Sequence, residues 1–376
     1  MKEEKQEKQI VKKKKKTKKV NKKKITLLIV VILLLIAVLI PGIGIIKLNS
    51  KGYSFSSSFK LYFSGLKSYT LDKDYSKTLD NIINTDQYKK EYLDNYLIID
   101  YYEDKEFNET INTYLDLGYT SNDINAIYKK EDKELIAKLK NNYVKDIISF
   151  IEYPFFKTDK LERYIQYYQD NQDYRRTIIE VNIGIDKVFY DDPVVVVNYS
   201  NDMLVNKYNK LASTFVPDDL TELTECSDSG EYLAREAKEA YDKMCEASKE
   251  SGLHLGVTSS YRSYEDQTNI YNSYLKSKGQ SYVDQYVATP GYSEHQTGLA
   301  LDVKSTVASP FKTTKEYRWM LDNSYKYGFI LRYPEEDEWL TGYSPEAWHF
   351  RYVGETIANY IHENDITYEE YCAMFM

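Results

Sequence analysis

The chain opens with two blocks of opposite character, a lysine-rich segment and an uninterrupted apolar run. Residues 1–24 carry thirteen lysines and three glutamates, and residues 25–46 (ITLLIVVILLLIAVLIPGIGII) contain no charged side chain. A helix of this length is long enough to cross a hydrocarbon core of about 30 Å. We therefore predict a basic cytoplasmic tail over residues 1–24 and a transmembrane helix, a signal anchor, over residues 25–46.

The charges on either side of the apolar run predict its orientation in the membrane. The tail has a net charge of +10 and the whole chain a net charge of −8, so residues 25–376 carry a net charge of −18. The positive-inside rule then leaves the tail in the cytoplasm and the acidic body outside the cell. Two alternatives stay open: a cleaved signal peptide, with Pro41 and Gly42 marking the processing region, and a buried core helix behind a disordered tail. An acidic body is a poor partner for DNA or RNA, so we expect no nucleic-acid ligand.

Residues 59–195 have apolar side chains at helical spacing, as at Ile111, Tyr114 and Leu115, and few glycines or prolines. We predict a helical extracellular domain built from hairpins, preceded by a polar linker over residues 47–58.

Tyrosine is abundant in this chain, with 39 residues. Tyrosines stack on sugars and also fill amphipathic cores, and we favour core filling. A weak similarity between residues 113–128 and 163–181 suggests a degenerate repeat.

After Pro193 short apolar runs alternate with turns. Nine of the fifteen glycines and all three tryptophans lie at or beyond Gly230. Strands are expected at 194–198, 254–260, 298–304, 329–332 and 347–353, and helices at 231–251, 264–278, 315–327, 355–362 and from Thr367 onward. This mixture indicates an α+β domain over residues 196–376.

The cysteines, Cys226, Cys245 and Cys372, are odd in number. Cys226 and Cys245 can pair in an exported protein, and three buried free thiols are an equally good interpretation.

Two of the four histidines have chemically suggestive neighbours. A catalytic zinc site takes three protein ligands and leaves one position for water. His295 precedes an expected strand that contains Asp302, and His349 lies on another. Glu346, three residues before His349, is placed to act as a general base without binding the metal. His254 and His362 have no such company, and we interpret them as structural.

A third segment, residues 259–267 (SSYRSYEDQ), follows a strand and opens a helix. Arg262 near a helix start favours binding of a substrate carboxylate or a developing oxyanion. Gln267 can hydrogen-bond a peptide group.

Together with residues 290–302 (PGYSEHQTGLALD), 346–354 (EAWHFRYVG) and 327–334, this segment resembles the VanY-like and LdcB-like zinc D,D- and L,D-carboxypeptidases. These enzymes of bacterial cell-wall metabolism form a branch of the LAS metallopeptidases. The resemblance covers roughly residues 205–376.

The resemblance implies a small antiparallel sheet with flanking helices and a Zn²⁺ cofactor. Its site residues carry over as a set: zinc ligands His295, Asp302 and His349, the base Glu346, Arg262 on the substrate, and substrate-binding Gln267, Ser293, Tyr261 and Trp348. Ser260 stands where glycine is common and Ala347 where proline is common, which bears on substrate preference but removes no reacting group.

The expected function is a membrane-anchored extracellular zinc carboxypeptidase that removes the terminal D-alanine from peptidoglycan stem peptides. The same zinc site would serve an endopeptidase cutting wall cross-links. A catalytically weak cell-wall-binding protein would be expected to lose a ligand or the base, and this sequence retains all four. The sequence leaves the choice between tetrapeptide and pentapeptide stems open, together with the role of the helical region.

Overall fold

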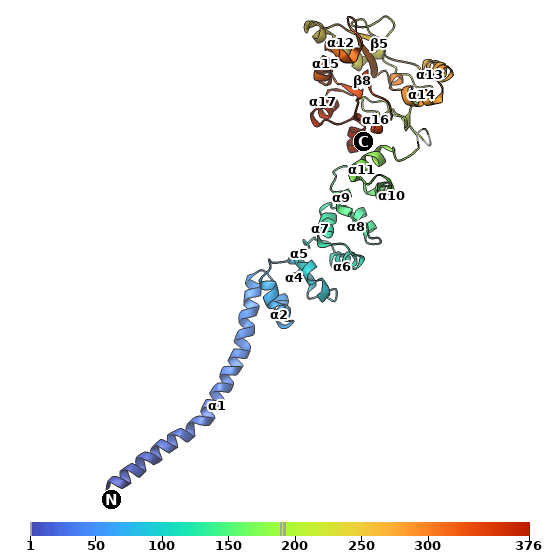
Figure 1. Cartoon of the computed structure of the whole chain (residues 1–376). Helices are drawn as coiled ribbons and strands as arrows, with labels where there is room; N and C mark the ends of the chain where they lie inside the picture. Colours follow the sequence, from blue (N-terminus) through green and yellow to red (C-terminus); the bar gives the residue numbers. More distant parts are fainter. Residues whose placement is uncertain (1, 189, 191–192) are drawn as a thin grey trace. The chain divides into compact units, whose positions relative to one another are not determined.

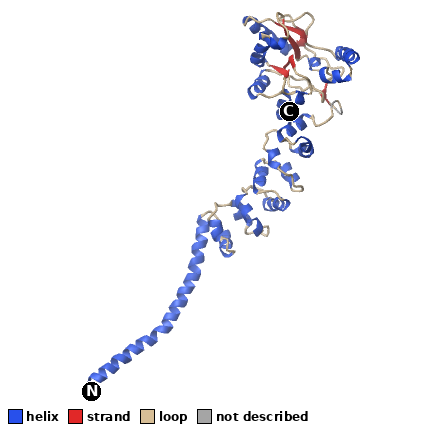
Figure 2. Ribbon diagram, viewed as in Figure 1, coloured by secondary structure: helices blue, strands red, loops and turns tan. Residues whose placement is uncertain are grey.

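The computed structural model describes residues 2–188, 190 and 193–376, with side chains of the first helix described from Lys23 onward. The chain forms two compact units, Met1–Ile151 and Glu152–Met376. Figure 1 follows the chain from the blue N-terminus to the red C-terminus, and Figure 2 shows helices in the first unit and the described strands, all of them in the second.

One helix, α1 (Lys2–Ser50), carries both the basic tail and the apolar run. Its segment Lys23–Ser50 is long and apolar enough to cross a membrane, by length and composition. The linker expected over residues 47–58 is shorter in the structure, because α1 continues to Ser50 and only the four residues 51–54 separate it from α2 (Phe55–Phe63). The serines that suggested a linker serve the helix instead: Ser54 caps α2 by accepting a hydrogen bond from the Ser57 N–H.

Short helices follow, as the apolar spacing predicted. In the first unit they are α3 (Lys67–Leu71), α4 (Lys77–Ile82), η1 (Lys90–Tyr92), α5 (Leu93–Ile98), α6 (Phe107–Leu117), α7 (Ser121–Lys129), α8 (Lys133–Leu139) and α9 (Ile147–Ile151). The second unit begins with η2 (Thr158–Lys160), α10 (Leu161–Asn171) and α11 (Tyr174–Ile183).

A tyrosine and an asparagine join neighbouring helices in the first unit. The Tyr96 hydroxyl accepts a hydrogen bond from the Lys89 N–H (3.3 Å) and donates one to Asn112 Oδ1 (2.6 Å). Asn112 Nδ2 then donates to the Gln87 carbonyl (2.6 Å). Tyr96 is fully buried, so its polar group is paired where water cannot reach it.

The same arrangement recurs in the second unit. The Tyr164 hydroxyl accepts from the Lys157 N–H (3.3 Å) and donates to Asn182 Oδ1 (2.5 Å), whose Nδ2 donates to the Phe155 carbonyl (2.9 Å). Two hairpins with one hydrogen-bond pattern form a structural repeat, in a register that differs from the one suggested by sequence similarity.

The second unit is built around a four-stranded antiparallel sheet in the order β5-β6-β8-β7. Its strands are β5 (Leu255–Ser259), β6 (Ala300–Ser305), β7 (Phe329–Tyr333) and β8 (Glu346–Tyr352). The flanking helices are α12 (Arg235–Glu250), α13 (Tyr264–Lys278), α14 (Gln280–Tyr286), α15 (Lys315–Asn323), α16 (Glu338–Thr341), α17 (Glu355–Asn364) and α18 (Tyr368–Phe375), with 3-10 turns η3 (Glu294–Thr297), η4 (Phe311–Thr313) and η5 (Ser324–Tyr327). In Figure 1, α12 and α15 lie across the sheet from α13 and α14. The α+β prediction is confirmed.

Two expected elements differ in extent. The run at 194–198 gives only β1 (Val194–Val195), which pairs in parallel with β2 (Asn209–Lys210). The helix expected from Glu231 begins at Arg235, because β4 (Tyr232–Ala234) pairs with β3 (Leu220–Glu222). Such pairing depends on residues distant in sequence, which local periodicity does not report.

The first hairpin of the second unit packs on the C-terminal helix. Arg175 forms an ion pair with Glu370 of α18 (2.8 Å), and Asn182 Nδ2 donates to the Ala373 carbonyl (2.9 Å). Ile183 packs against the apolar cluster that contains Tyr368. The division between units therefore falls at Ile151, well before the boundary at residue 195 that composition suggested.

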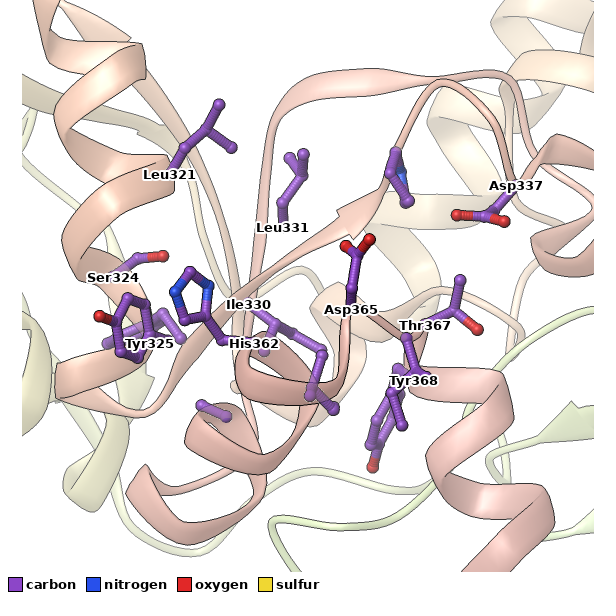
Figure 3. Close-up of a pocket in the computed structure, with 15 residues that line it drawn as sticks. Leu321, Ser324, Tyr325, Ile330, Leu331, Asp337, His362, Asp365, Thr367 and Tyr368 are labelled. Atoms are coloured by element: carbon purple, nitrogen blue, oxygen red, sulfur yellow. The ribbon is translucent and has the colours of Figure 1, made fainter.

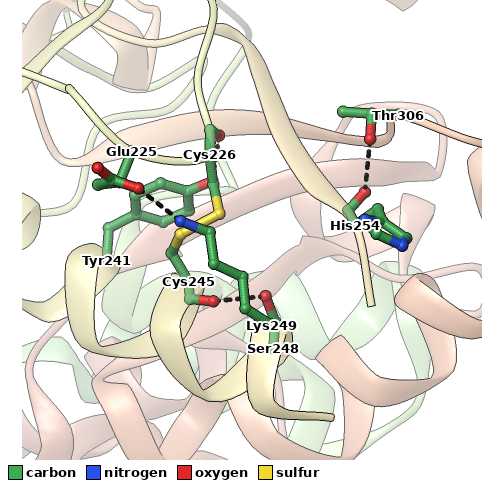
Figure 4. The surroundings of a disulfide bond; sticks show 8 residues. All are labelled: Glu225, Cys226, Tyr241, Cys245, Ser248, Lys249, His254 and Thr306. Atoms are coloured by element: carbon green, nitrogen blue, oxygen red, sulfur yellow. Dashed lines mark hydrogen bonds and ion pairs between the residues drawn. A yellow bond between two sulfur atoms is a disulfide. The ribbon is translucent and has the colours of Figure 1, made fainter. Parts of the chain in front are cut away.

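A disulfide joins Cys226, which follows β3, to Cys245 of α12, with the two Cα atoms 6.0 Å apart. Figure 4 shows the bond beside Tyr241, whose hydroxyl donates to the Cys226 carbonyl (2.8 Å). Cys372 is a buried free thiol. The interpretation with one pair is thus the one that the structure adopts.

Candidate active site

Strand register brings together two of the predicted metal ligands. Asp302 of β6 and His349 of β8 are direct cross-strand partners, and His349 Nδ1 lies 3.1 Å from Asp302 Oδ1. His295 lies on η3, in the turn that leads into β6, and its Nε2 is 3.5 Å from the same oxygen. One ligand atom from each of the three residues lies within 4.8 Å of the other two.

These spacings fit zinc. Ligand atoms about 2.0–2.2 Å from a tetrahedral ion are about 3.3–3.6 Å from one another. Two imidazoles and one carboxylate also match a catalytic zinc site, which leaves a fourth position for water. The donor set formed by His295, Asp302 and His349 therefore has the chemistry and the spacing that a zinc ion requires.

Each histidine is oriented through its other ring nitrogen. His295 Nδ1 lies 2.7 Å from the Ser260 carbonyl, and His349 Nε2 lies 3.4 Å from Glu294 Oε2. Both partners only accept hydrogen bonds, so these nitrogens carry the protons. The lone pairs of His295 Nε2 and His349 Nδ1 then face Asp302, where the metal would bind.

Glu294 is fully buried and lies at the centre of an ion network. Its Oε1 pairs with Arg332 Nε (2.7 Å) and with Arg351 Nη1 (3.1 Å). Arg332 makes a second, bidentate pair with Glu369 of α18 (2.8 and 2.5 Å). Burial alone would raise the pKa of Glu294, but the two guanidinium charges hold that pKa well below its usual range. Glu294 is thus a fixed anion behind His349.

The centre attracts positive charge. Burial lowers the pKa of His349, yet hydrogen bonds to Asp302 and Glu294 outweigh this effect and raise the pKa to about 9. Burial would raise the pKa of Asp302, but the two histidines hold it well below its usual range. Carboxylates that stabilise an imidazolium in this way also stabilise a divalent cation in the same place.

Glu346 is the first residue of β8, and its Oε2 lies 3.7 Å from His349 Nδ1. Burial raises the pKa of Glu346 to about 7, partly offset by the charge of His349. A carboxyl group with this pKa exchanges protons readily near neutral pH, as a general base must.

Arg262 faces the same cavity. Its Nη1 donates to Gln267 Oε1 (2.8 Å) and its Nη2 to Ser259 Oγ (2.7 Å). Gln267 is itself fixed, because its Nε2 donates to the Ala288 carbonyl (2.6 Å). Burial lowers the pKa of Arg262, but a guanidinium stays charged in proteins. Two hydrogen bonds hold the Arg262 guanidinium in place and leave further N–H groups, which match a carboxylate ligand.

A cavity of about 470 Å³ contains this chemistry. The predicted residues that line it are Arg262, Gln267, Ser293, His295, Asp302, Glu346, Trp348 and His349. Tyr261 is not among the lining residues, and its substrate contact stays a prediction.

The sequence argument missed several lining residues. Tyr333 of β7 lies against the His349 ring, with 5.0 Å between ring centroids, and Tyr343 lies against Tyr333. Glu294, adjacent to His295, also received no role. Its position next to a ligand was the available signal, but its arginine partners lie 38 and 57 residues away.

The other two histidines lie outside this centre. Figure 3 shows a second cavity, lined in part by His362, which stacks on Tyr325 with 3.6 Å between ring centroids. His254 immediately precedes β5, and its carbonyl accepts a hydrogen bond from the Thr306 hydroxyl (Figure 4). Neither lines the cavity that contains His295 and His349.

Part of the chain is similar to known proteins. Residues 230–355 match the family model VanY, described as D-alanyl-D-alanine carboxypeptidase. The Bacillus subtilis protein YodJ is 41% identical over 179 residues, which are 45% of this chain and 65% of YodJ. The chain thus spans slightly less than two thirds of that relative.

This chain matches almost the whole length of two further proteins. VanXYC of Enterococcus gallinarum, a bifunctional D-Ala-D-Ala dipeptidase and carboxypeptidase, is 35% identical over 45% of this chain and 91% of its own length. The solved structure of the LD-carboxypeptidase LdcB is 39% identical over 50% of this chain and 93% of its own, with a TM-score of 0.47.

We expect Glu294→Gln to weaken zinc binding. The variant keeps the shape of the side chain but removes the charge that orients and polarises His349, and loss of such a partner typically costs about 10–100-fold in metal affinity. Competition with a chromogenic chelator measures this, with circular dichroism to verify folding. Glu335→Gln, at an exposed acid, is the control. A folded Glu294→Gln protein with unchanged affinity would contradict the assigned role.

Proposed function

Because the chain belongs to the VanY family of D-alanyl-D-alanine carboxypeptidases, we propose that it removes the terminal D-alanine from peptidoglycan stem peptides as a zinc carboxypeptidase. One observation carries the proposal: the His295, Asp302 and His349 donor set, the base Glu346 and the cation Arg262 line a single cavity.

Arg262 fixes the direction of the substrate. Its two hydrogen bonds to Gln267 and Ser259 hold the guanidinium in place and leave further N–H groups for a ligand. A free C-terminal carboxylate is the group of a stem peptide that matches such a site. This favours an exopeptidase over an endopeptidase, whose substrate would bring an uncharged amide to Arg262.

Glu346 acts first as the general base and then as the general acid of the reaction. Zinc, when bound by the three ligands, supplies a Lewis acid that acidifies a water molecule and polarises the scissile carbonyl. Glu346 takes the proton from the water as its oxygen forms the new C–O bond. As the C–N bond breaks, Glu346 returns that proton to the amine of the departing D-alanine. A pKa near 7 suits both transfers, because the carboxyl group neither holds nor releases the proton strongly.

We also propose that the chain is anchored in the cell membrane by residues 25–46, with its N-terminus in the cytoplasm and the peptidase outside. Three observations support this. The helix is long and apolar enough to span a bilayer, thirteen lysines precede it, and the Cys226–Cys245 disulfide is typical of an oxidising compartment.

A comparison of variants separates base from ligand. Glu346→Gln keeps the size of the side chain but accepts no proton, so zinc should remain bound while kcat falls by roughly 10²–10⁴-fold. His349→Ala and Asp302→Ala should lose zinc as well as rate, because two ligands remain. The readouts are metal content and mass spectrometry of defined tetrapeptide and pentapeptide stems, which also identifies the preferred substrate. Full turnover by Glu346→Gln would show that another group is the base.

The carboxylate site is tested with Arg262→Met and a stem peptide whose C-terminus is amidated. Hydrogen bonds to charged groups contribute about 1.5–3 kcal/mol, so either change alone should lower kcat/KM by roughly 10–100-fold. Combining them should cost little more than one, since both remove the same interaction. Fully multiplicative losses would mean that Arg262 does not bind the terminal carboxylate.

Membrane orientation predicts a protection pattern. Protease added to intact, wall-stripped cells should digest the acidic body and spare the lysine-rich tail, detected with tags at the two ends. Digestion of the tail with a protected body would reverse the proposed topology, and release of the body into the medium without protease would indicate a cleaved signal peptide.

A further inference from the structure

Helix α2 carries an unusual surface. Phe55, Phe59 and Phe63 recur every fourth residue, and they are 70%, 51% and 59% exposed. The Phe59 and Phe63 rings contact each other, with 4.5 Å between centroids. Large aromatic side chains gathered on one helix face and left in water are unfavourable, so such a stripe usually marks a contact surface.

The opposite face of α2 is already occupied. Ser57, Ser58 and Leu61 are completely buried against the rest of the first unit. The helix is therefore held in one orientation, and the phenylalanine stripe points away from the folded unit. Figure 1 shows α2 beside the C-terminal end of α1.

The contact between α2 and α1 sets the position of the phenylalanine stripe relative to the end of the apolar run. Tyr62 of α2 packs directly on Gly44 of α1, where a Cβ atom would clash with the tyrosine ring. Gly44 belongs to the apolar run, which ends two residues later at Ile46. With a helical rise of about 1.5 Å per residue, Tyr62 lies about 3 Å inside the apolar end of the span.

We propose that α2 is an interfacial helix whose Phe55, Phe59 and Phe63 side chains insert into the outer leaflet of the membrane crossed by α1. This inference rests on the proposed membrane anchor. An apolar run of 22 residues is about as long as the hydrocarbon core is thick, so its end can lie neither far above nor far below the headgroups. A helix packed on that end lies at the level where aromatic side chains are favoured.

The remaining residues of α2 suit such a position. Ser56, Lys60 and Ser64 are exposed and lie on the side of the helix next to the stripe, away from Tyr62. Lys67, after α2, sits over the Tyr62 ring with its ammonium group 5.3 Å from the ring centroid. Of these two lysines only Lys60 lies beside the stripe, and a lysine in this position reaches lipid phosphates while its stem stays in apolar surroundings. The occupant that fits is a phospholipid surface.

The test places a nitroxide spin label at single introduced cysteines in the full chain, reconstituted into phosphatidylcholine–phosphatidylglycerol vesicles. The native cysteines do not interfere, because two form a disulfide and Cys372 is buried. The positions are Phe59→Cys on the stripe, Ser64→Cys on the polar side and Leu34→Cys within the span. Power-saturation measurements compare collisions with oxygen, which partitions into lipid, and with a water-soluble nickel chelate.

We expect the Phe59 label to lose nickel access relative to Ser64 and to gain oxygen access, at a depth between Ser64 and Leu34. Equal nickel access at Phe59 and Ser64, with Leu34 protected, would overturn the inference and leave the anchor intact. Spin–spin broadening at Phe59 without oxygen access would overturn it in favour of a second copy of the chain. Nickel access at Leu34 would overturn the anchor and the inference together, whereas stem-peptide cleavage, measured on the same samples, reports separately on the proposed activity.

Discussion

The second unit depends on a buried, charge-balanced network of two carboxylates and two guanidinium groups. Glu294 pairs with Arg332 and Arg351, and Arg332 pairs in turn with Glu369. All four side chains are shielded from water, where an unpaired charge would cost several kcal/mol. The network joins η3, β7, β8 and α18, so the same ion pairs hold the turn that carries His295, the sheet and the C-terminal helix together.

This network also determines the chemistry of the metal centre. Glu294 is kept ionised by the arginines and therefore accepts a hydrogen bond from the protonated Nε2 of His349, which leaves the Nδ1 lone pair for the metal. His295 uses its opposite nitrogen because the Ser260 carbonyl binds Nδ1. Two histidines with opposite tautomers thus present their lone pairs to one point beside Asp302 without any rearrangement.

Sequence patterns predicted the elements whose causes are local. Helix α13 was predicted with its observed bounds, because Ser263 caps its start and Gly279 follows its end. The proposed ligands and the base were singled out because rare residue types stood at informative spacings, and Arg262 was singled out through the family resemblance. The part that stayed hidden is non-local: β4 exists through its partner β3, and Glu294 acquires its role from arginines distant in sequence. Tyr261 does not line the cavity, so its contact with the substrate stays a prediction from the motif alone.

The tyrosines of the helical region have a structural explanation in the repeated hydrogen-bond pattern. Tyr96 and Tyr164 are fully buried, and each joins a backbone N–H to an asparagine of the following helix. A phenylalanine would fill the same space but leave both partners unpaired, so tyrosine is required there for a reason unrelated to sugars. In the second unit this hairpin packs on α18 through Asn182, which also donates to the Ala373 carbonyl. Because α18 supplies Glu369 to the network behind the candidate metal site, the last helical repeat contacts the helix that pairs with Arg332. The repeat is therefore part of the peptidase fold as well as part of the helical region.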